Sequence, residues 1–343
     1  MSFQFIKTLS GGLSQYGSQN PALGELPLQI LLHIVSCTSA LRDILESQPK
    51  SSQSEVSSQV YLPFLNGFVG SLGKYLLDSL SYDPKTNLSQ TLTAYQVTFR
   101  HLIRLFPELA KRRHKTTGKL LLHHIVLKSR PATIVEAMRA TLALAPDSTK
   151  TPDSSGALPL HWATKNDSFP ADCVDILVQS YPQCIQALDQ KGCLPLHWAV
   201  STHPPPLEVI KRLVKLYPKS SSVASSTGNL ALHYAVSHDA PSLEVVNLLL
   251  AVFPDAVRHK NTVGELPIHR LLSRITPDMG VLTTLVQKFP EGLLVTNAQG
   301  HTPLHVALDH HLPSTILTYL IQQGGRAAEV GDGDGYYPLH MSL

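Results

Sequence analysis

Seven histidines occupy one position of a regular pattern, and imidazole is a common metal ligand and proton acceptor. They are His123, His161, His197, His233, His269, His305 and His340. Ligands of one zinc ion each lie about 2 Å from it, whereas helices packed in a row are about 8–10 Å apart. Histidines on successive helices of such a row cannot share an ion. We therefore predict a structural role for them and no metal site.

Other motifs that could carry chemistry are incomplete. The segment Gly67–Tyr75 resembles a phosphate-binding loop, but Phe68 and Tyr75 occupy positions that require glycine and Ser or Thr. Asp332–Gly335 resembles the start of a calcium loop, but Tyr336 occupies the third ligand position, so a turn is the better interpretation. No G-x-S-x-G nucleophile elbow occurs. We predict no catalytic residues and no bound cofactor, and we expect that the protein is not an enzyme.

The cysteines and the apolar segments bear on the compartment of the protein. The cysteine spacing fits neither a disulfide framework nor a zinc ribbon, and reduced thiols are typical of cytosolic and nuclear proteins. The N-terminal residues do not form a secretory signal, and no run of about 18 apolar residues could form a membrane helix. We predict a cytoplasmic protein, with the nucleus as the alternative, that does not insert into a membrane. The cysteines are Cys37, Cys173, Cys184 and Cys193.

The charge of the chain disfavours nucleic acid as its partner. The net charge is +3 and the pI is about 8.6, whereas nucleic-acid-binding domains typically exceed a pI of about 9 and cluster their Lys and Arg. The densest charge run is Lys111–Lys115, which we interpret as a solvated finger. An acidic partner or a nuclear import signal is the alternative interpretation of this run.

The histidines belong to an internal repeat. The phrase Gly-x-Leu-Pro-Leu-His, as in Gly156–His161, recurs at intervals of 38, 36, 36, 36, 36 and 35 residues. A weaker copy begins at Gly24 and has Gln29 in place of the histidine. Self-similarity at such a period is typical of proteins built from stacked units. The repeat glycines are Gly118, Gly156, Gly192, Gly228, Gly264, Gly300 and Gly335.

A second landmark keeps the same register. An aromatic-Pro pair stands 10 residues before the next repeat glycine, as in Tyr217-Pro218. Between the landmarks, apolar residues recur three or four positions apart, as in Leu207–Tyr217 and Leu243–Phe253. Proline ends such a helix, and proline after the opening leucine suits the first turn of a shorter helix. A unit is therefore predicted as a turn, a short inner helix, a loop, a longer outer helix and an extended return.

The Gly-x-x-Pro-Leu-His-x-Ala phrase resembles the ankyrin repeat, whose signature is T-P-L-H-x-A in about 33 residues. The resemblance extends from about Gly24 to the C-terminus and is strong from Gly118 onward. It implies an all-α, ankyrin-type helical repeat solenoid with short turn or hairpin fingers. In that family the Thr and His bind the backbone and each other. Here the Thr occurs only as Thr302, so we expect a looser contact elsewhere, with the aliphatic replacement packing instead.

The repeat spacing predicts three regions. Residues 1–23 form an N-terminal segment, 24–117 an atypical first repeat with an insertion at about 46–90, and 118–343 the regular repeats. An unrecognisable degenerate repeat within the gap is the alternative to an insertion. The last repeat is incomplete, which we interpret as a fragment or an unusual gene model, with a frayed end or a partner-covered end as alternatives.

The residue after each repeat histidine is unusual, because it is His124, Trp162, Trp198, Tyr234, Arg270 and Val306 in successive units. Packing between units is the first interpretation. If these side chains are partly exposed, they form a stripe of the residue types enriched in binding hot spots.

The resemblance implies a protein partner, of unknown identity, at the turn tips and the exposed ends of the inner helices. We expect a non-enzymatic interaction scaffold or adaptor that uses its concave face. The alternative is the targeting part of a longer enzyme or channel subunit. Together with the stripe, the predicted partner-binding residues are Trp162, Lys165, Lys191, Trp198, Thr202, Asn229, Tyr234, His238, Glu265, Arg270, Arg274, His301 and His310.

Overall fold

The computed structural model describes residues 108–111, 113–114, 116–128, 131–166, 168–238 and 241–342. The chain divides into two compact units, Met1–Leu109 and Ala110–Leu343. The predicted N-terminal segment and almost all of the atypical first repeat therefore lie outside the described residues. Across the described residues the regular structure is entirely helical, with no strand. None of the helices in these ranges is long and apolar enough to cross a membrane.

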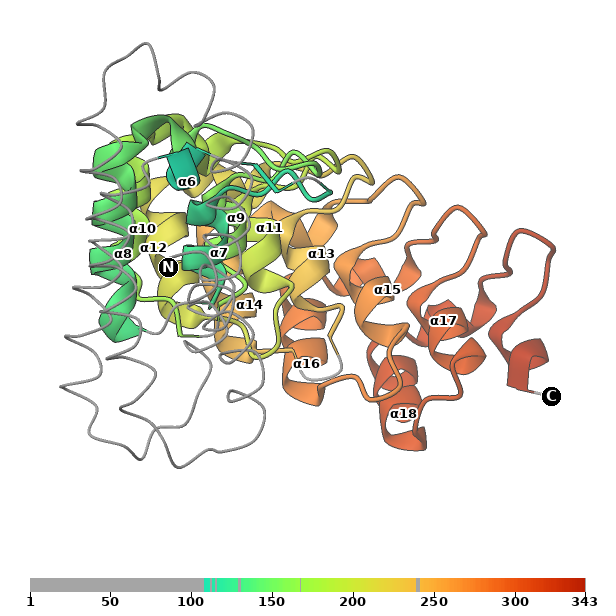
Figure 1. The fold of residues 1–343 in the computed structure, drawn as a ribbon. Helices are drawn as coiled ribbons and strands as arrows, with labels where there is room; N and C mark the ends of the chain where they lie inside the picture. Colours follow the sequence, from blue (N-terminus) through green and yellow to red (C-terminus); the bar gives the residue numbers. More distant parts are fainter. Residues whose placement is uncertain are drawn as a thin grey trace, which may run out of the picture. The chain divides into compact units, whose positions relative to one another are not determined.

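The second unit consists of successive helix hairpins that lie side by side (Figure 1). Each hairpin has a short inner helix and an outer helix. Inner helices contact the inner helices of the next hairpin, and from α10 to α16 outer helices contact outer helices. The inner helices are α7 (Leu121–Lys128), α9 (Pro159–Ala163), α11 (Pro195–Val200), α13 (Ala231–Ala235), α15 (Pro267–Leu272) and α17 (Pro303–Asp309). The outer helices are α8 (Pro131–Leu144), α10 (Asp172–Ser180), α12 (Leu207–Leu216), α14 (Leu243–Val252), α16 (Met279–Lys288) and α18 (Ser314–Gln323).

A proline begins most inner helices, as predicted. In α9 the N-cap residue Leu158 has φ −80° and ψ 164°, and Pro159 is the first helical residue. The residue before a proline prefers extended backbone, and proline has no N–H to leave unpaired in the first turn. The sequence Leu-Pro therefore fixes the start of the helix.

The predicted extended return after the outer helix begins with a 3-10 turn, which the sequence did not reveal. The aromatic residue Tyr181 leaves the helix with φ −151° and ψ 91°, and Pro182 then opens a 3-10 turn. The N–H of Cys184 donates to the carbonyl of Tyr181 at 3.0 Å, and extended backbone resumes at Ala187. Proline with its fixed φ suits the first position of such a turn. The turns that begin with proline in this position are η2 (Pro146–Thr149), η3 (Pro182–Gln186), η4 (Pro218–Ser222), η5 (Pro254–Arg258) and η6 (Pro290–Leu294), and η7 (Gly325–Glu329) follows α18 without a proline. The remaining elements are α6 (Glu108–Lys111) and η8 (Pro338–Ser342), which follows the last finger where the other repeats have an inner helix.

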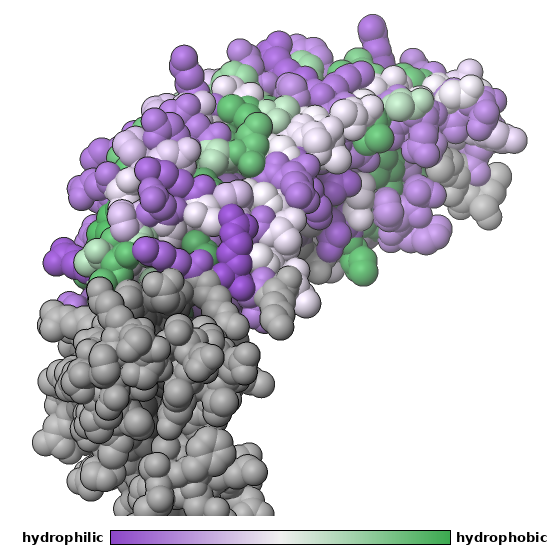
Figure 2. Space-filling view, turned by 45° about the horizontal axis from the view of Figure 1, so that its top comes forward, coloured by the Kyte–Doolittle hydropathy of each residue, from purple (hydrophilic) through white to green (hydrophobic). Residues whose placement is uncertain are grey.

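The core lies between inner and outer helices. In α12, Val209, Ile210, Leu213 and Val214 are buried, while Leu207 is half-buried. Polar side chains cover most of the face drawn in Figure 2, with hydrophobic ones scattered among them. The apolar period of the sequence therefore marks the buried stripe of each outer helix, as expected for a helix packed on one side.

The loop from each 3-10 turn to the next inner helix forms a finger, and these fingers project on one side of the row (Figure 1). A repeat glycine ends each finger turn with positive φ, +72° at Gly228. A Cβ there would lie 2.7 Å from the backbone nitrogen of Thr262 in the next finger. That nitrogen donates to the carbonyl of Thr227 at 3.1 Å. Glycine is needed both for its backbone conformation and for the close approach of the next finger.

Replacing Gly228 with alanine is expected to lower the free energy of unfolding by about 1–3 kcal/mol, because positive φ and the contact with Thr262 are both unfavourable for a side chain. Urea unfolding followed by circular dichroism measures the change. Gly325→Ala is the matched control, because Gly325 lacks positive φ and no atom lies within 4 Å of its Cβ position. Equal losses in the two variants would contradict this account of the finger.

Candidate interaction surface

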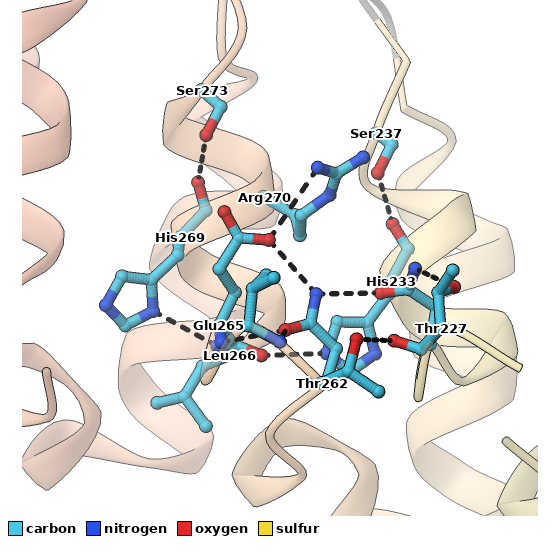
Figure 3. Close-up of polar contacts among 12 residues, drawn as sticks. Thr227, His233, Ser237, Thr262, Glu265, Leu266, His269, Arg270 and Ser273 are labelled. Carbon is cyan, nitrogen blue, oxygen red and sulfur yellow. Dashed lines mark hydrogen bonds and ion pairs between the residues drawn. The ribbon is translucent and has the colours of Figure 1, made fainter. Parts of the chain in front are cut away.

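Six of the seven repeat histidines, from His123 to His305, bond to backbone in two directions. In His269, Nδ1 accepts the N–H of Leu266 at 3.2 Å, and Nε2 lies 3.2 Å from the carbonyl oxygen of His301 in the next finger. Because Nδ1 faces a donor, the ring hydrogen must be on Nε2, which donates to the carbonyl. Figure 3 shows the hydrogen bond between His269 and Leu266 and the one between His233 and the carbonyl of Glu265. We call this two-way contact the histidine bridge.

The histidine bridge does not depend on threonine. Among the repeat histidines of the described residues, only His305 is reached by a hydroxyl, because Thr302 donates to its Nδ1 at 2.8 Å. Yet the N–H to Nδ1 distance is 3.2 Å there and 2.8 Å at Leu194, where no hydroxyl is present. The expected loosening is therefore not seen, because the two backbone groups hold the ring by themselves. Leu194 is buried, as predicted for an aliphatic replacement.

Burial keeps these histidines neutral. It lowers the pKa of His123, His197, His233 and His269 from 6.5 to about 4, although the bond to a backbone carbonyl partly offsets this effect. Protonation would place a positive charge in a buried site that excludes water. It would also put a hydrogen on Nδ1, which would then face the hydrogen of a backbone N–H. The described residues contain no group of three or more His, Cys, Asp or Glu side chains suited to a metal ion.

A residue type that the sequence analysis overlooked begins most fingers. Asp189 lies three residues before Gly192, and its Oδ1 accepts the N–H groups of Lys191 and Cys193, both at 2.8 Å. Such turns are typical of Asp and Asn, which fold back onto their own backbone. The recurrence of Asp or Asn at this repeat position was the sequence signal that could have identified these residues. The same contact is made by Asp153, Asn261, Asn297 and Asp332, whereas Ser225 replaces it in one unit.

The finger carboxylate also holds the residue after the histidine. Nε1 of Trp162 donates to Oδ2 of Asp153 at 2.9 Å, and Nε1 of Trp198 donates to Oδ2 of Asp189 at 2.8 Å. The two indole rings meet edge to face, with centroids 5.1 Å apart. Both rings are half-buried, so the predicted stripe is partly packed and partly exposed.

The stripe continues with Tyr234 and Arg270, whose polar ends also contact residues of a finger. The hydroxyl of Tyr234 donates to Oγ of Ser225 at 3.2 Å. Arg270 lies 3.7 Å from Glu265 (Figure 3). The carboxylate of Glu265 also accepts a hydrogen bond from Nδ2 of Asn261 at 3.0 Å. The stripe ends at Val306, which is buried. Trp162, Trp198, Tyr234 and Arg270 therefore form one row of half-exposed side chains on four successive inner helices.

The predicted fingertip residues differ in their exposure. Lys191 is exposed, and its carbonyl accepts the N–H of Ser226 in the next finger at 2.9 Å. Asn229 is half-buried and accepts Nδ2 of Asn261 at 3.0 Å. His301 stacks on His305 with ring centroids 5.6 Å apart and lies 3.7 Å from Asp332. The finger residues other than Lys191 thus have side-chain partners within the fold.

The predicted residues at the ends of the inner helices are more accessible. Lys165 and His310 are exposed, and Thr202 and Arg274 are half-exposed. The hydroxyl of Thr202 donates to the carbonyl of Ala199 at 2.8 Å, which caps the end of α11. His238 lies 3.2 Å from the carbonyl of Val200 and stacks on His203. The structure thus brings the aromatic stripe and Lys165 together, while the other helix ends follow on successive hairpins.

Comparison with known proteins assigns the chain to no family. Neither a protein-family model nor a curated protein sequence matches the chain. The likeness to ankyrin repeats therefore depends on the motif residues and on the geometry of the bridges and fingers.

Replacing His197 with glutamine is expected to flatten the pH dependence of stability. Between pH 6.5 and about 4 the unfolded state binds a proton at His197 that the folded state does not, so wild-type stability falls as the pH falls through this window. From pH 7.5 to 4.5 the variant should lose about 2 kcal/mol less than wild type, since a tenfold difference in proton affinity between the two states corresponds to about 1.4 kcal/mol. Urea unfolding at a series of pH values gives the difference.

The exposed residue His310 supplies the matched control, since His310→Gln changes the same chemical group outside a histidine bridge. Its unfolding curve should follow that of wild type across the series. A His197→Gln variant that loses stability in parallel with wild type on acidification would show that the bridge does not require a neutral ring.

Proposed function

We propose that this chain is an ankyrin-type repeat solenoid that acts as a non-enzymatic scaffold or adaptor and binds another protein. The repeat architecture is supported by contacts that recur from unit to unit. Five histidines bond to a carbonyl of the following unit at 3.1 or 3.2 Å, and His197 bonds to the carbonyl of Val223, just before the next finger turn, at 3.1 Å. Units that depend on their neighbours in this way are characteristic of stacked repeats, whose extended surfaces serve for binding.

The row of half-exposed side chains is the observation that carries the proposal. Trp, Tyr and Arg are the residues most enriched in binding hot spots, and here they follow the histidine on four successive inner helices. Hydrogen bonds to Asp153, Asp189 and Ser225 hold the three aromatic side chains before a partner arrives, and Arg270 forms an ion pair with Glu265. Binding to side chains that are already ordered costs less conformational entropy.

A cytoplasmic location is part of the same proposal. The thiols of Cys173, Cys184 and Cys193 are free and buried. Burial raises the pKa of Cys184 to about 12 and that of Cys173 to about 11, which suppresses the reactive thiolate. Unpaired, unreactive thiols suit a reducing compartment.

The proposal is tested by affinity capture with the whole chain as bait. In the inner-face variant Trp198→Ala/Arg274→Ala, partners that wild type captures from extract of the source cells should be reduced at least tenfold, as measured by quantitative mass spectrometry. Loss of a hot-spot side chain typically weakens binding by about 2 kcal/mol or more, which is more than tenfold.

The matched control is Leu216→Ala/Lys288→Ala, which also removes one large apolar side chain and one cation, but from the exposed side of outer helices α12 and α16. This variant should capture the same partners as wild type, and circular dichroism should show all three proteins folded. If the inner-face variant and the outer-helix variant lose partners equally, the stripe is not the binding surface.

A further inference from the structure

We propose that Thr116 is a phosphorylation site for a serine/threonine protein kinase that selects basic residues before its acceptor. This inference goes beyond the proposed function and does not depend on it. It concerns the first finger of the described residues, 111–119, which we call the basic finger. The sequence of this finger contains five Lys or Arg residues and no acid.

The turn of the basic finger differs from the turns of the later fingers. The N–H of Gly118 donates to the carbonyl of His114 at 2.9 Å, which spans four residues, whereas the corresponding bond of the next finger spans three. No Asp or Asn is present to fold back onto this turn. Instead, Nδ1 of His114 accepts the N–H of Thr117 at 3.4 Å and lies 3.2 Å from the hydroxyl oxygen of Thr116. The tip of this finger therefore carries a hydroxyl where the later turns have a carboxylate or an amide.

The hydroxyl of Thr116 is accessible at the tip of the basic finger. Thr116 is exposed and stands two residues before the repeat glycine. In later fingers the hydroxyl at this position donates to a carbonyl of the preceding finger, as Ser154 does to Thr117 at 2.8 Å and Ser226 to Lys191 at 2.7 Å. Thr116 contacts a side chain of its own turn instead. Exposed loop tips are the segments that most readily enter the cleft of another enzyme.

The adjacent residue Thr117 is less suitable as an acceptor. It is half-buried, and its carbonyl accepts both the N–H and the hydroxyl of Ser154, at 3.0 and 2.8 Å. Its own hydroxyl lies 3.5 Å from the N–H nitrogen of Lys119. Thr117 is thus tied to the next finger, and the structure favours Thr116 of the two threonines.

The residues before Thr116 supply the charge that a basic-directed kinase recognises. Arg113 stands three residues before Thr116, and Lys111 and Arg112 precede it. Lys111 and Arg113 are exposed. One guanidinium nitrogen of Arg113 donates to the carbonyl of Pro152 at 3.1 Å, and an arginine has five N–H donors in all. Kinases distinguish their substrates by such charge patterns, which complement acidic groups in the substrate cleft.

Three later fingertips lack this charge pattern although they present an exposed hydroxyl at the same repeat position. Their hydroxyl residues are Ser154, Ser226 and Thr262. The residues three positions before them are Thr151, Val223 and His259, where Thr116 has Arg113. These three fingertips therefore serve as controls within the same chain.

The reaction is an ordinary phosphoryl transfer from ATP. Oγ1 of Thr116 attacks the γ-phosphorus, the bond from this phosphorus to the bridging oxygen breaks, and ADP leaves, while the hydroxyl proton passes to the catalytic aspartate of the kinase. The phosphothreonine carries about two negative charges at pH 7. Phosphorylation therefore offsets part of the positive charge of the basic finger, and it leaves the histidine bridges unchanged.

Phosphorylation of the full chain tests the inference. The chain is incubated with Mg-ATP and the catalytic domain of a calcium/calmodulin-dependent protein kinase, an enzyme that selects arginine three residues before its acceptor. Phosphopeptide mass spectrometry should find most of the phosphate on Thr116. Thr116→Val should remove most of the incorporation, whereas the matched control Thr117→Val should retain it. Incorporation that is equal in these two variants, or spread equally over Thr116 and the three later fingertips, would overturn the inference.

A charge variant tests the recognition of Arg113. Arg113→Gln should lower kcat/KM for the kinase about tenfold, because a charge-assisted contact with the kinase is lost. Arg326→Gln is the matched control, since Arg326 is exposed on η7 and its loss changes the net charge equally. Circular dichroism should show both variants folded. Equal values of kcat/KM for the two variants would contradict the assignment of Arg113 as the recognised residue.

The modification is also expected in the cell. Chain recovered from source cells treated with a phosphatase inhibitor should carry phosphate on Thr116, as mapped by mass spectrometry, and Thr116→Val chain should lack that phosphopeptide. Wild-type chain without phosphate on Thr116 under these conditions would overturn the inference. Because partner capture is measured separately, this outcome leaves the proposed function standing.

Discussion

The neutral imidazole between two backbone groups is the contact on which the described fold depends. A short inner helix has too few residues to be stable alone, and α9 has only five. The histidine satisfies the N–H that opens this helix and, through its other nitrogen, a carbonyl of the next unit. One side chain thus completes a helix and joins it to its neighbour. Because both bonds need the neutral ring, burial and hydrogen bonding support the same protonation state.

The finger also uses one side chain for two purposes. Asp189 holds its own turn with one carboxylate oxygen and Trp198 with the other, so the same carboxylate shapes the finger and orients the residue after the histidine. Where Ser225 replaces the acid, Tyr234 reaches the serine instead. Where Asn261 replaces it, the carboxylate of Glu265 accepts a hydrogen bond from the Asn261 amide and forms an ion pair with Arg270. The residue at the start of the finger therefore changes together with the side chain that it must hold.

Local rules explain how much of this could be predicted. Leu-Pro and the apolar period locate the inner and outer helices, because both act within one turn of backbone. The 3-10 turn at Pro182 was missed, since proline after an aromatic residue fits both an extended segment and a tight turn. The partners of Trp162 and Trp198 could not be derived from the spacing alone, because Lys119 and Lys165 reach them from the preceding repeat. The Asp at the finger start was visible in the sequence, but its importance depends on two bonds that only the folded finger brings together.

The division between the histidine and the residue after it suggests how such a surface can vary without loss of the fold. His161, His233 and His269 face inward, where a side chain without two such polar atoms would leave backbone groups of two units unpaired. The side chain at the following position is half-exposed in four units, where it is Trp, Trp, Tyr and Arg in succession. Changes at that position alter the chemistry offered to a partner while the bridge beneath it remains the same. In the proposed function, adjacent residues carry stability and recognition, so units that share the histidine bridge can present different side chains to a partner.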